Sequence, residues 1–358
     1  MSPYETLISA ASGMIGTGLL NEIDNVSLRD AEAFVASNRE CLQSARNALN
    51  ELCSILVKNE AVYYDECLGD IQLFRRLAYA FQLQMRIAES QANIAEAAQI
   101  AVEVLELSNV FRRGGLILDF LVAIAIASLG TETLRRHRQR LDSPTRAKVI
   151  DAIARIERER ETFDVIAERD RDWEIAVGWH DQPIDVSQLD ASIDGEKPDE
   201  AERAVRECIE SLINLPRQEK NSMHAGIEKR HTAMLRMLAV DLAIRSYHAA
   251  RSSYPDDLET LVPSHLAELP LDPFTDRPFV YRKQPDDSFL LYSPGPSRID
   301  HGAVFGHWLM VDTGQADYCL DTGDYELDCC SISSNHPGFI SRIGGSILWV
   351  WRRFRLNH

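Results

Sequence analysis

Residues 254–295 read YPDDLETLVPSHLAELPLDPFTDRPFVYRKQPDDSFLLYSPG, and this stretch decides the architecture of the C-terminal part of the chain. Two apolar runs, Pro278–Tyr281 and Phe289–Gly295, are rich in aromatic and branched residues, which favours β-strands. Asp286 and Asp287 lie between the runs and supply a turn. The stretch therefore predicts a small antiparallel sheet.

A long helical run precedes this sheet, from about Ser222 to Ser252. Between Thr232 and Ala250 its apolar residues cover more than one face, whereas a helix that only backed a sheet would need one stripe. We expect the helix to pack against the sheet on one side and against a helical domain on the other. Pro255 disfavours helical backbone at Tyr254 and ends the run.

The ordered set "long helix, YP, LxxLVP, LPxDPF, PxxY, FxLYSxG", from Glu228 to Gly314, resembles the globular head of type II secretion major pseudopilins. The resemblance implies a helical spine that carries a small antiparallel sheet. It also implies an acidic calcium loop after the YSxG motif, where Asp300 is the nearest carboxylate. Calcium prefers six to eight oxygens, so further acidic residues would have to fold back: Asp312, Asp317, Asp321 and Asp324.

The spine is internal in this chain, and a long segment precedes it, so the resemblance predicts a shape and not filament assembly. The whole chain also resembles uncharacterised bacterial proteins in which a helical domain precedes such a head. That similarity in layout implies no activity.

The first half of the chain reads as successive helices. One apolar stripe runs from Phe34 through Cys41 and Leu52 to Leu56, with three- and four-residue spacing. Two further runs, Phe74–Ala88 and Ile94–Leu105, are separated only around residues 91–93, which predicts an antiparallel αα-hairpin. Ser143 and Pro144 indicate a new helix start, and the charged run Ile156–Trp173 is expected on the surface.

Leu116–Leu129 follows Gly114 and Gly115 and is apolar on every face except at Asp119 and Ser128. Its short length and internal carboxylate favour a central place in a bundle over a membrane. A carboxylate on such a helix is costly unless it is paired. We therefore expect Asp119 to form a structural ion pair, with Arg75, Arg76 or Arg86 as candidates. The functional alternative is an acid in a pocket between helices.

These patterns predict a mainly α fold, an antiparallel helical bundle or αα-hairpins, with a small C-terminal α+β module carrying an antiparallel sheet on a long helix. The expected organisation, in residue numbers, is 1–180 helical domain, 181–200 acidic loop or linker, 201–330 long helix plus pseudopilin-like module, and 331–358 basic aromatic tail.

Composition narrows the function classes. A hydrophobic content of 45% and a charged content of 26% are ordinary for a globular protein and argue against a disordered chain. The formal net charge of −17 argues against a nucleic-acid partner, because phosphate binding needs a concentrated basic surface. No motif for phosphate or dinucleotide binding is present in the sequence.

Residues of the types that bind metals or act in catalysis are scattered. Seven cysteines (Cys41, Cys53, Cys67, Cys208, Cys319, Cys329 and Cys330) include no CxxC pair. Cys41 and Cys53 are expected on one helix, too far apart to bond. His224 and His231 are two turns apart, and His301 and His307 have no defined partner. His180 beside Asp181 is expected to cap a loop after Trp179. We assign no catalytic, cofactor or metal residue.

Two segments leave membrane contact open. Leu7–Leu20 is apolar but lacks a basic region before it, so a helix packed on the body is expected, with a membrane anchor as the alternative. The tail Ile340–His358 combines aromatic residues with arginines, which suits local docking or a membrane interface. The compartment, envelope or cytoplasm, is not decided.

The leading hypothesis is a non-enzymatic structural or protein-interaction protein, associated with a bacterial envelope and binding an unidentified protein partner. The alternatives are an enzyme with a pocket near Asp119 and a calcium-binding module around Asp300.

Overall fold

The computed structural model describes residues 2–55, 63–178, 216–305 and 314–321. The predicted acidic loop, the Trp179–Asp181 segment, His307, the basic tail, and the cysteines Cys208, Cys329 and Cys330 lie outside these ranges. The described part is mainly helical with a small antiparallel sheet, as predicted. The helices are α1 (Pro3–Ser12), α2 (Leu28–Ser37), α3 (Arg39–Leu49), α4 (Tyr63–Ser90), α5 (Ile94–Arg112), α6 (Ile117–His137), α7 (Ser143–Glu159), α8 (Phe163–Val177) and α10 (Arg217–Arg251).

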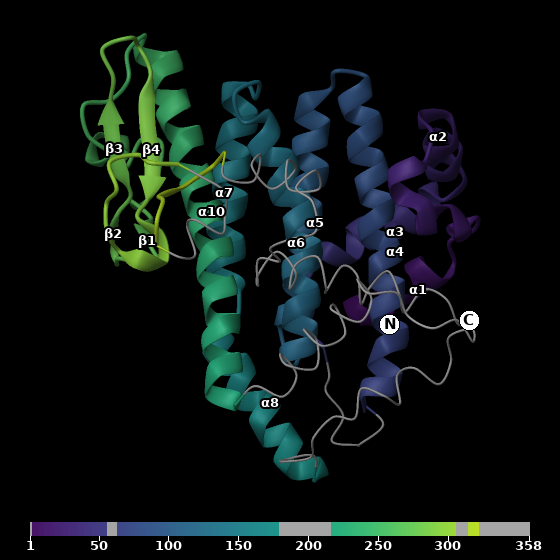
Figure 1. Ribbon diagram of the computed structural model, residues 1–358. Helices are drawn as coiled ribbons and strands as arrows, with labels where there is room; N and C mark the ends of the chain where they lie inside the picture. Colours follow the sequence, from purple (N-terminus) through teal and green to yellow (C-terminus); the bar gives the residue numbers. More distant parts are fainter. Residues whose placement is uncertain (1, 56–62, 179–215, 306–313, 322–358) are drawn as a thin grey trace, which may run out of the picture.

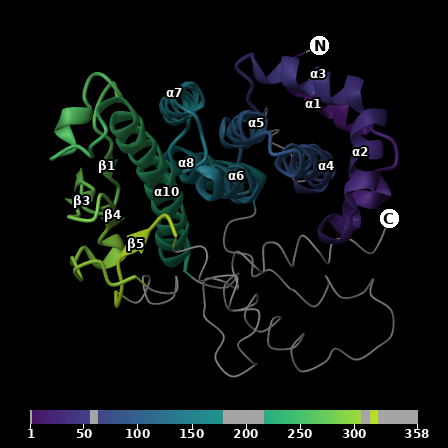
Figure 2. The same cartoon turned by 90° about the horizontal axis from the view of Figure 1, so that it is seen from above.

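The helices stand side by side in a row that ends in the sheet (Figure 1). Seen from above, α10 lies between the strands and α6, α7 and α8, while α1, α2 and α3 lie at the far end beyond α4 and α5 (Figure 2). α10 contacts α7 and α6 as well as β1 (Leu271–Asp272) and β4 (Phe289–Ser293). The prediction of two packed faces on this helix is confirmed.

The C-terminal module that carries the strands is called the head below. Its larger sheet has strand order β3-β4-β5, where β3 is Val280–Lys283 and β5 is Tyr318–Cys319. β3 and β4 pair antiparallel with Val280 opposite Tyr292, which confirms the predicted hairpin. β1 and β2 (Arg277–Pro278) form a separate two-stranded ladder. Phe289 contacts the rings of Tyr254 and Tyr281, which places these aromatic side chains between the hairpin and the end of α10.

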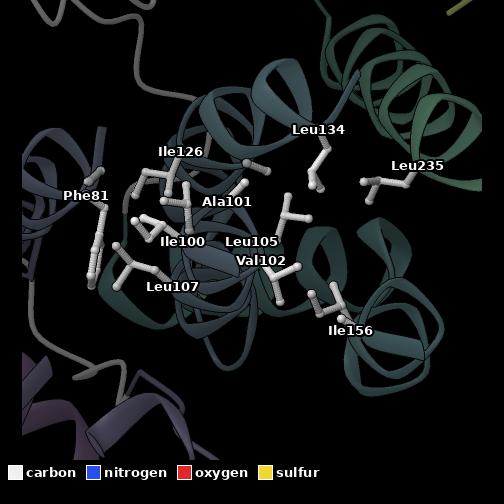
Figure 3. Packing of buried hydrophobic residues seen from close by; sticks show 14 of the residues in the cluster. Phe81, Ile100, Ala101, Val102, Leu105, Leu107, Ile126, Leu134, Ile156 and Leu235 are labelled. Carbon is white, nitrogen blue, oxygen red and sulfur yellow. The ribbon is translucent and has the colours of Figure 1, made fainter. Parts of the chain in front are cut away.

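The predicted αα-hairpin is also confirmed. α4 and α5 are joined through Gln91–Asn93, and the Asn93 side chain caps α5 by accepting from Glu96 N. Phe81 on α4, Ala101 and Leu105 on α5, and Ile126 on α6 lie in one buried cluster (Figure 3). α6 is therefore the central helix that its composition predicted. It begins after Gly114, where a positive φ of 78° interrupts the helical conformation.

The prediction that the apolar stripe from Phe34 to Leu56 lies on a single helix is wrong. The helix breaks at Asn38, which is buried and whose amide group exchanges hydrogen bonds with both backbone polar groups of Ile15. α3 ends at Leu49, so Cys41 and Cys53 do not share a helix. Leu52 is 75% exposed. A tertiary contact to a side-chain amide overrides the local periodicity here.

The expectation that Ile156–Trp173 lies on the surface is also wrong. The chain leaves the helical conformation between α7 and α8, and Phe163, Ile166 and Trp173 are buried. The break lets α8 turn one apolar face toward α6 and α10. At the start of α7, Asp142 and not Ser143 is the capping residue, because its carboxylate accepts from Thr145 N.

The segment Leu7–Leu20 packs on the body, as expected, although not as one helix. It forms the end of α1 and the start of a 3-10 helix (Thr17–Asn25), and both Leu7 and Leu20 are buried in the main core.

The run of arginines at the end of α6 joins the helical part to the head. Arg138 donates two hydrogen bonds to the Asp321 carboxylate at 2.7 and 2.9 Å, and Arg135 donates to the Leu320 carbonyl at 3.0 Å. Both arginines are buried. Asp241 on α10 lies 3.8 Å from Arg138 Nε and accepts from Arg245 at 2.7 Å. Favourable interaction with the helix dipole, which the C-terminal position of these residues suggests, is thus only part of their role.

Substitution by alanine should have opposite effects on stability at two helical glycines, Gly130 and Gly226. A Cβ at Gly130 on α6 would lie 2.5 Å from the Ala101 carbonyl of α5, whereas a Cβ at Gly226 on α10 would meet nothing within 4 Å. Gly130→Ala should therefore destabilise the protein by about 1–3 kcal/mol through overpacking. Gly226→Ala should stabilise it by about 0.5–1 kcal/mol, because alanine loses less backbone entropy in a helix. Urea unfolding of both variants tests this, and an unchanged or higher free energy of unfolding for Gly130→Ala would contradict the close approach of α5 and α6.

Candidate functional site

The loop after β4, residues 297–305, is held by hydrogen bonds to Asp300 and Asp317, and we call it the head loop. The Asp317 side chain binds the backbone of this loop on its buried side. This carboxylate is fully buried and accepts from the backbone N–H groups of His301, Ala303 and Val304 at 3.1, 2.9 and 3.2 Å. Asp317 N also donates to the Val304 carbonyl at 2.7 Å. The loop backbone is fixed by these bonds.

Asp300 fixes the other side of the head loop. Its carboxylate accepts from Tyr292 Oη, Gly302 N and Arg282 Nη2, each at 2.8 Å. The Gly302 N–H and then the Tyr292 hydroxyl hold the pKa of Asp300 below its usual range, since both stabilise the ionised form. Tyr292 is itself fully buried and lies edge-on to Phe305.

The DPF turn is anchored by Asp272, a residue to which the sequence patterns assigned no role. Asp272 is fully buried and accepts from Phe274 N at 3.0 Å, Thr275 Oγ1 at 3.2 Å and Ser293 Oγ at 2.8 Å. It therefore joins the LPxDPF motif to the YS step at the end of β4. Burial raises the pKa of Asp272, although these hydrogen bonds oppose the shift. The spacing of motifs along the sequence gave no signal for this contact.

The acidic residues proposed for calcium do not converge in the described part of the chain. Asp300 and Asp317 bind the head loop, and Asp321 pairs with Arg138. Asp312 and Asp324 lie outside the described residues. Within those residues, no group of three or more His, Cys, Asp or Glu side chains could hold a metal ion.

We therefore expect no calcium dependence of stability. The Arg282 guanidinium already pairs with Asp300, and backbone N–H groups already donate to Asp317, so a cation would have to displace these donors. Millimolar calcium and a chelator should give the same melting temperature within error. A rise with calcium would show binding to the folded state and would restore the calcium-module hypothesis.

The head loop exposes two apolar side chains on this fixed backbone. Ile299 is 61% exposed and Val304 is 47% exposed. An exposed apolar residue is common on its own. Two on a loop whose backbone is already ordered are a candidate contact surface, because binding would cost little further loop entropy.

Asp119 is placed at the first turn of α6 and is fully buried. Its carboxylate accepts from Leu116 N at 2.7 Å and so caps the helix. A Cβ at Gly115 would lie 2.6 Å from Asp119 Cβ, which explains the glycine before this helix. The proposed arginine partner Arg86 instead donates to the carbonyls of Ile23 and Val26. The cap was readable from sequence, since acidic residues favour the first turn of a helix.

His224 and His231 lie on α10 and enter buried surroundings. His224 packs against Phe120 and Phe163, and its Nδ1 is buried without a hydrogen-bond partner among the described residues. Burial lowers its pKa to about 4, helped by the charge of Lys220. His231 retains partial surface exposure, but the protein packed around its ring lowers its pKa to about 3, with Arg160 and Arg112 contributing.

The cysteines show no pairing in the described residues. Cys41, Cys53 and Cys319 form no disulfide bond with one another. Burial raises the pKa of the Cys53 thiol to about 11, which makes it a poor nucleophile.

One described helix, α6, is long and apolar enough to cross a membrane, but 56% of its most apolar window is buried inside the protein. A core helix of a soluble protein meets the same criteria of length and composition, and α6 packs against α4, α5, α8 and α10.

Comparison with known proteins assigns no family. No protein-family model, no curated protein and no solved structure matches this chain.

Proposed function

We propose that this chain is a non-enzymatic protein-interaction protein, in which a helical scaffold presents a pseudopilin-like head to a protein partner at a bacterial envelope. The observation that carries the proposal is the head loop, where Asp300 and Asp317 fix the backbone while Ile299 and Val304 remain exposed.

The attachment of the head supports the presenting role of the helical part. Arg135 and Arg138 bind the segment after β5, and α10 is shared between the helical core and the sheet. The buried cluster includes Leu291 and Leu320 of the head together with residues of α5 and α6. A contact surface mounted in this way needs no domain closure before it binds.

The structural roles of the buried and loop aspartates also favour a binding role for the protein. Asp119 caps a helix, Asp272 joins two motifs, and Asp300 and Asp317 order a loop. Each of these carboxylates accepts hydrogen bonds from donors of its own protein, which gives it a structural role.

Affinity capture from native extract with the full-length chain tests the proposal. The test variant is Ile299→Asp with Val304→Asp. The matched control is Val165→Asp with Ile175→Asp, because these residues of α8 have similar exposures of 47% and 57%. We expect at least a ~10-fold loss of the captured partner in the head-loop variant, as for the central residues of an interface, and no loss in the control.

The melting temperature of both variants should stay near that of the parent chain, since all four side chains are exposed. Equal capture by the head-loop variant and the control would refute the head loop as the binding surface. Capture of no protein or membrane fraction by the parent chain would refute the interaction role.

A further inference from the structure

A small cavity lies among α5, α6, α7 and α10, away from the head loop. It has a volume of about 10 Å³, room for a particle near the size of one water molecule. Leu105, Ile156 and Leu235 belong to its apolar wall and come from three different helices (Figure 3). Its polar lining is Ser108, Asn109, Arg112, Arg160 and His231.

Two arginines bring unpartnered donors to this cavity. Arg112 is 2% exposed, and its Nη1 has no hydrogen-bond partner among the described residues. Arg160 Nη1 is likewise buried and without a partner. A buried donor that makes no hydrogen bond carries its full desolvation cost, so both groups call for an acceptor inside the cavity.

The other nitrogens of these arginines are already engaged. Arg112 donates through Nε and Nη2 to the Glu161 carbonyl and through Nη2 to the Glu228 carboxylate. Arg160 Nη2 donates to Thr232 Oγ1 at 3.0 Å and lies 3.4 Å from Glu157 Oε1. Neither carboxylate is among the residues that line the cavity. The lining therefore contains cations and no anion.

The remaining polar lining groups do not change this balance. The Ser108 hydroxyl donates to the Leu105 carbonyl, and the Asn109 amide donates to the Ile156 carbonyl. Burial and then the charge of Arg160 lower the pKa of Arg112 to about 10, so the two guanidinium groups repel one another. The same two charges disfavour protonation of His231.

We propose that this cavity binds a single halide-sized inorganic anion, chloride being the abundant one, between the unpartnered Nη1 groups of Arg112 and Arg160. An anion accepts from both donors and offsets their repulsion, whereas a water molecule would satisfy the donors and leave the repulsion. This inference is independent of the proposed function.

Thermal unfolding of the full chain in chloride, bromide or gluconate at constant ionic strength tests the proposal. Above the Kd, we expect the melting temperature to rise by about 2 °C for each ~10-fold increase in halide concentration. Gluconate, which is too large, should give no such rise. The same melting temperature in chloride and gluconate would overturn the proposal.

Substitutions near the cavity test whether the halide dependence of the melting temperature arises there. Arg160→Gln should abolish the halide dependence, whereas Arg158→Gln, at an exposed position on the same helix, should retain it. A halide effect that persists in Arg160→Gln would place the anion elsewhere and overturn the proposal. If Arg160→Gln does not fold, crystals of the parent chain in bromide decide the question. An anomalous peak within hydrogen-bond distance of both Nη1 groups is expected, and a water molecule there in its place would overturn the assignment.

Discussion

Replacing Glu228 by glutamine should lower the free energy of unfolding by about 3–5 kcal/mol, the usual cost of removing one partner of a buried ion pair. Glu228 accepts from Arg112, whose guanidinium is almost wholly buried, and also from Phe163 N at 2.9 Å. The neutral amide would leave the Arg112 charge poorly compensated in a region of low dielectric constant. It would also weaken the link that α10 makes between α5 and the start of α8.

Urea unfolding at neutral pH measures this loss. Glu219→Gln provides the control, because Glu219 is an exposed residue on the same helix. It lies in the first turn of α10, so its loss should cost no more than about 1 kcal/mol through the helix dipole. Similar changes in the two variants would mean that the Arg112–Glu228 contact contributes no more than a surface charge.

Acidification should destabilise the protein through two histidines. The pKa values of His224 and His231 in the folded chain are about 4 and about 3, below the unfolded value near 6.5. As the pH falls below about 6.5, the unfolded state therefore binds these protons before the folded state does. The stability that depends on the neutral imidazoles is fully present above this pH and is lost progressively toward pH 4 and pH 3.

His224, the more deeply buried of the two, should account for about 3 kcal/mol across the full window, and the partly exposed His231 acts in the same direction. The measurement is the slope of unfolding free energy against pH between 4.5 and 7. His224→Phe, which keeps an aromatic ring beside Phe120 and Phe163, should flatten that slope, and so should His231→Leu.

Comparison with the parent chain is needed because some carboxyls act in the opposite direction. Burial raises the pKa values of Glu103, Glu106, Asp170 and Asp272, so these groups favour the folded state as the pH falls. The difference in slope between each histidine variant and the parent chain removes this contribution. Unchanged slopes in both variants would show that neither imidazole is desolvated in the folded protein.

The described helices and the hairpin were largely predictable from local patterns. The turn at Gln91–Asn93, the apolar α6 and the β3–β4 pairing each depend on short-range periodicity and turn chemistry, which the sequence displays directly. The two faces of α10 were also visible, because its apolar residues exceed one stripe.

The breaks in the helices were not predictable in the same way. Asn38 ends α2 because its amide finds the backbone of Ile15, more than 20 residues earlier in the chain. The break before α8 buries Phe163 and Ile166, which a charged run concealed. In both places a distant partner supplies more free energy than the local helical preference, so local sequence gave no warning.

The roles of the charged residues depended on tertiary structure almost entirely. The sequence by itself determined a mainly helical chain, a strand hairpin on a long helix, and the burial of α6, because apolar spacing and turn residues act over a few positions. Only the tertiary structure decided that Asp317 orders the head loop and that Arg112 and Arg160 face one cavity. A charged side chain is satisfied by whichever donor or acceptor the fold brings to it, and that partner is seldom a neighbour in the sequence.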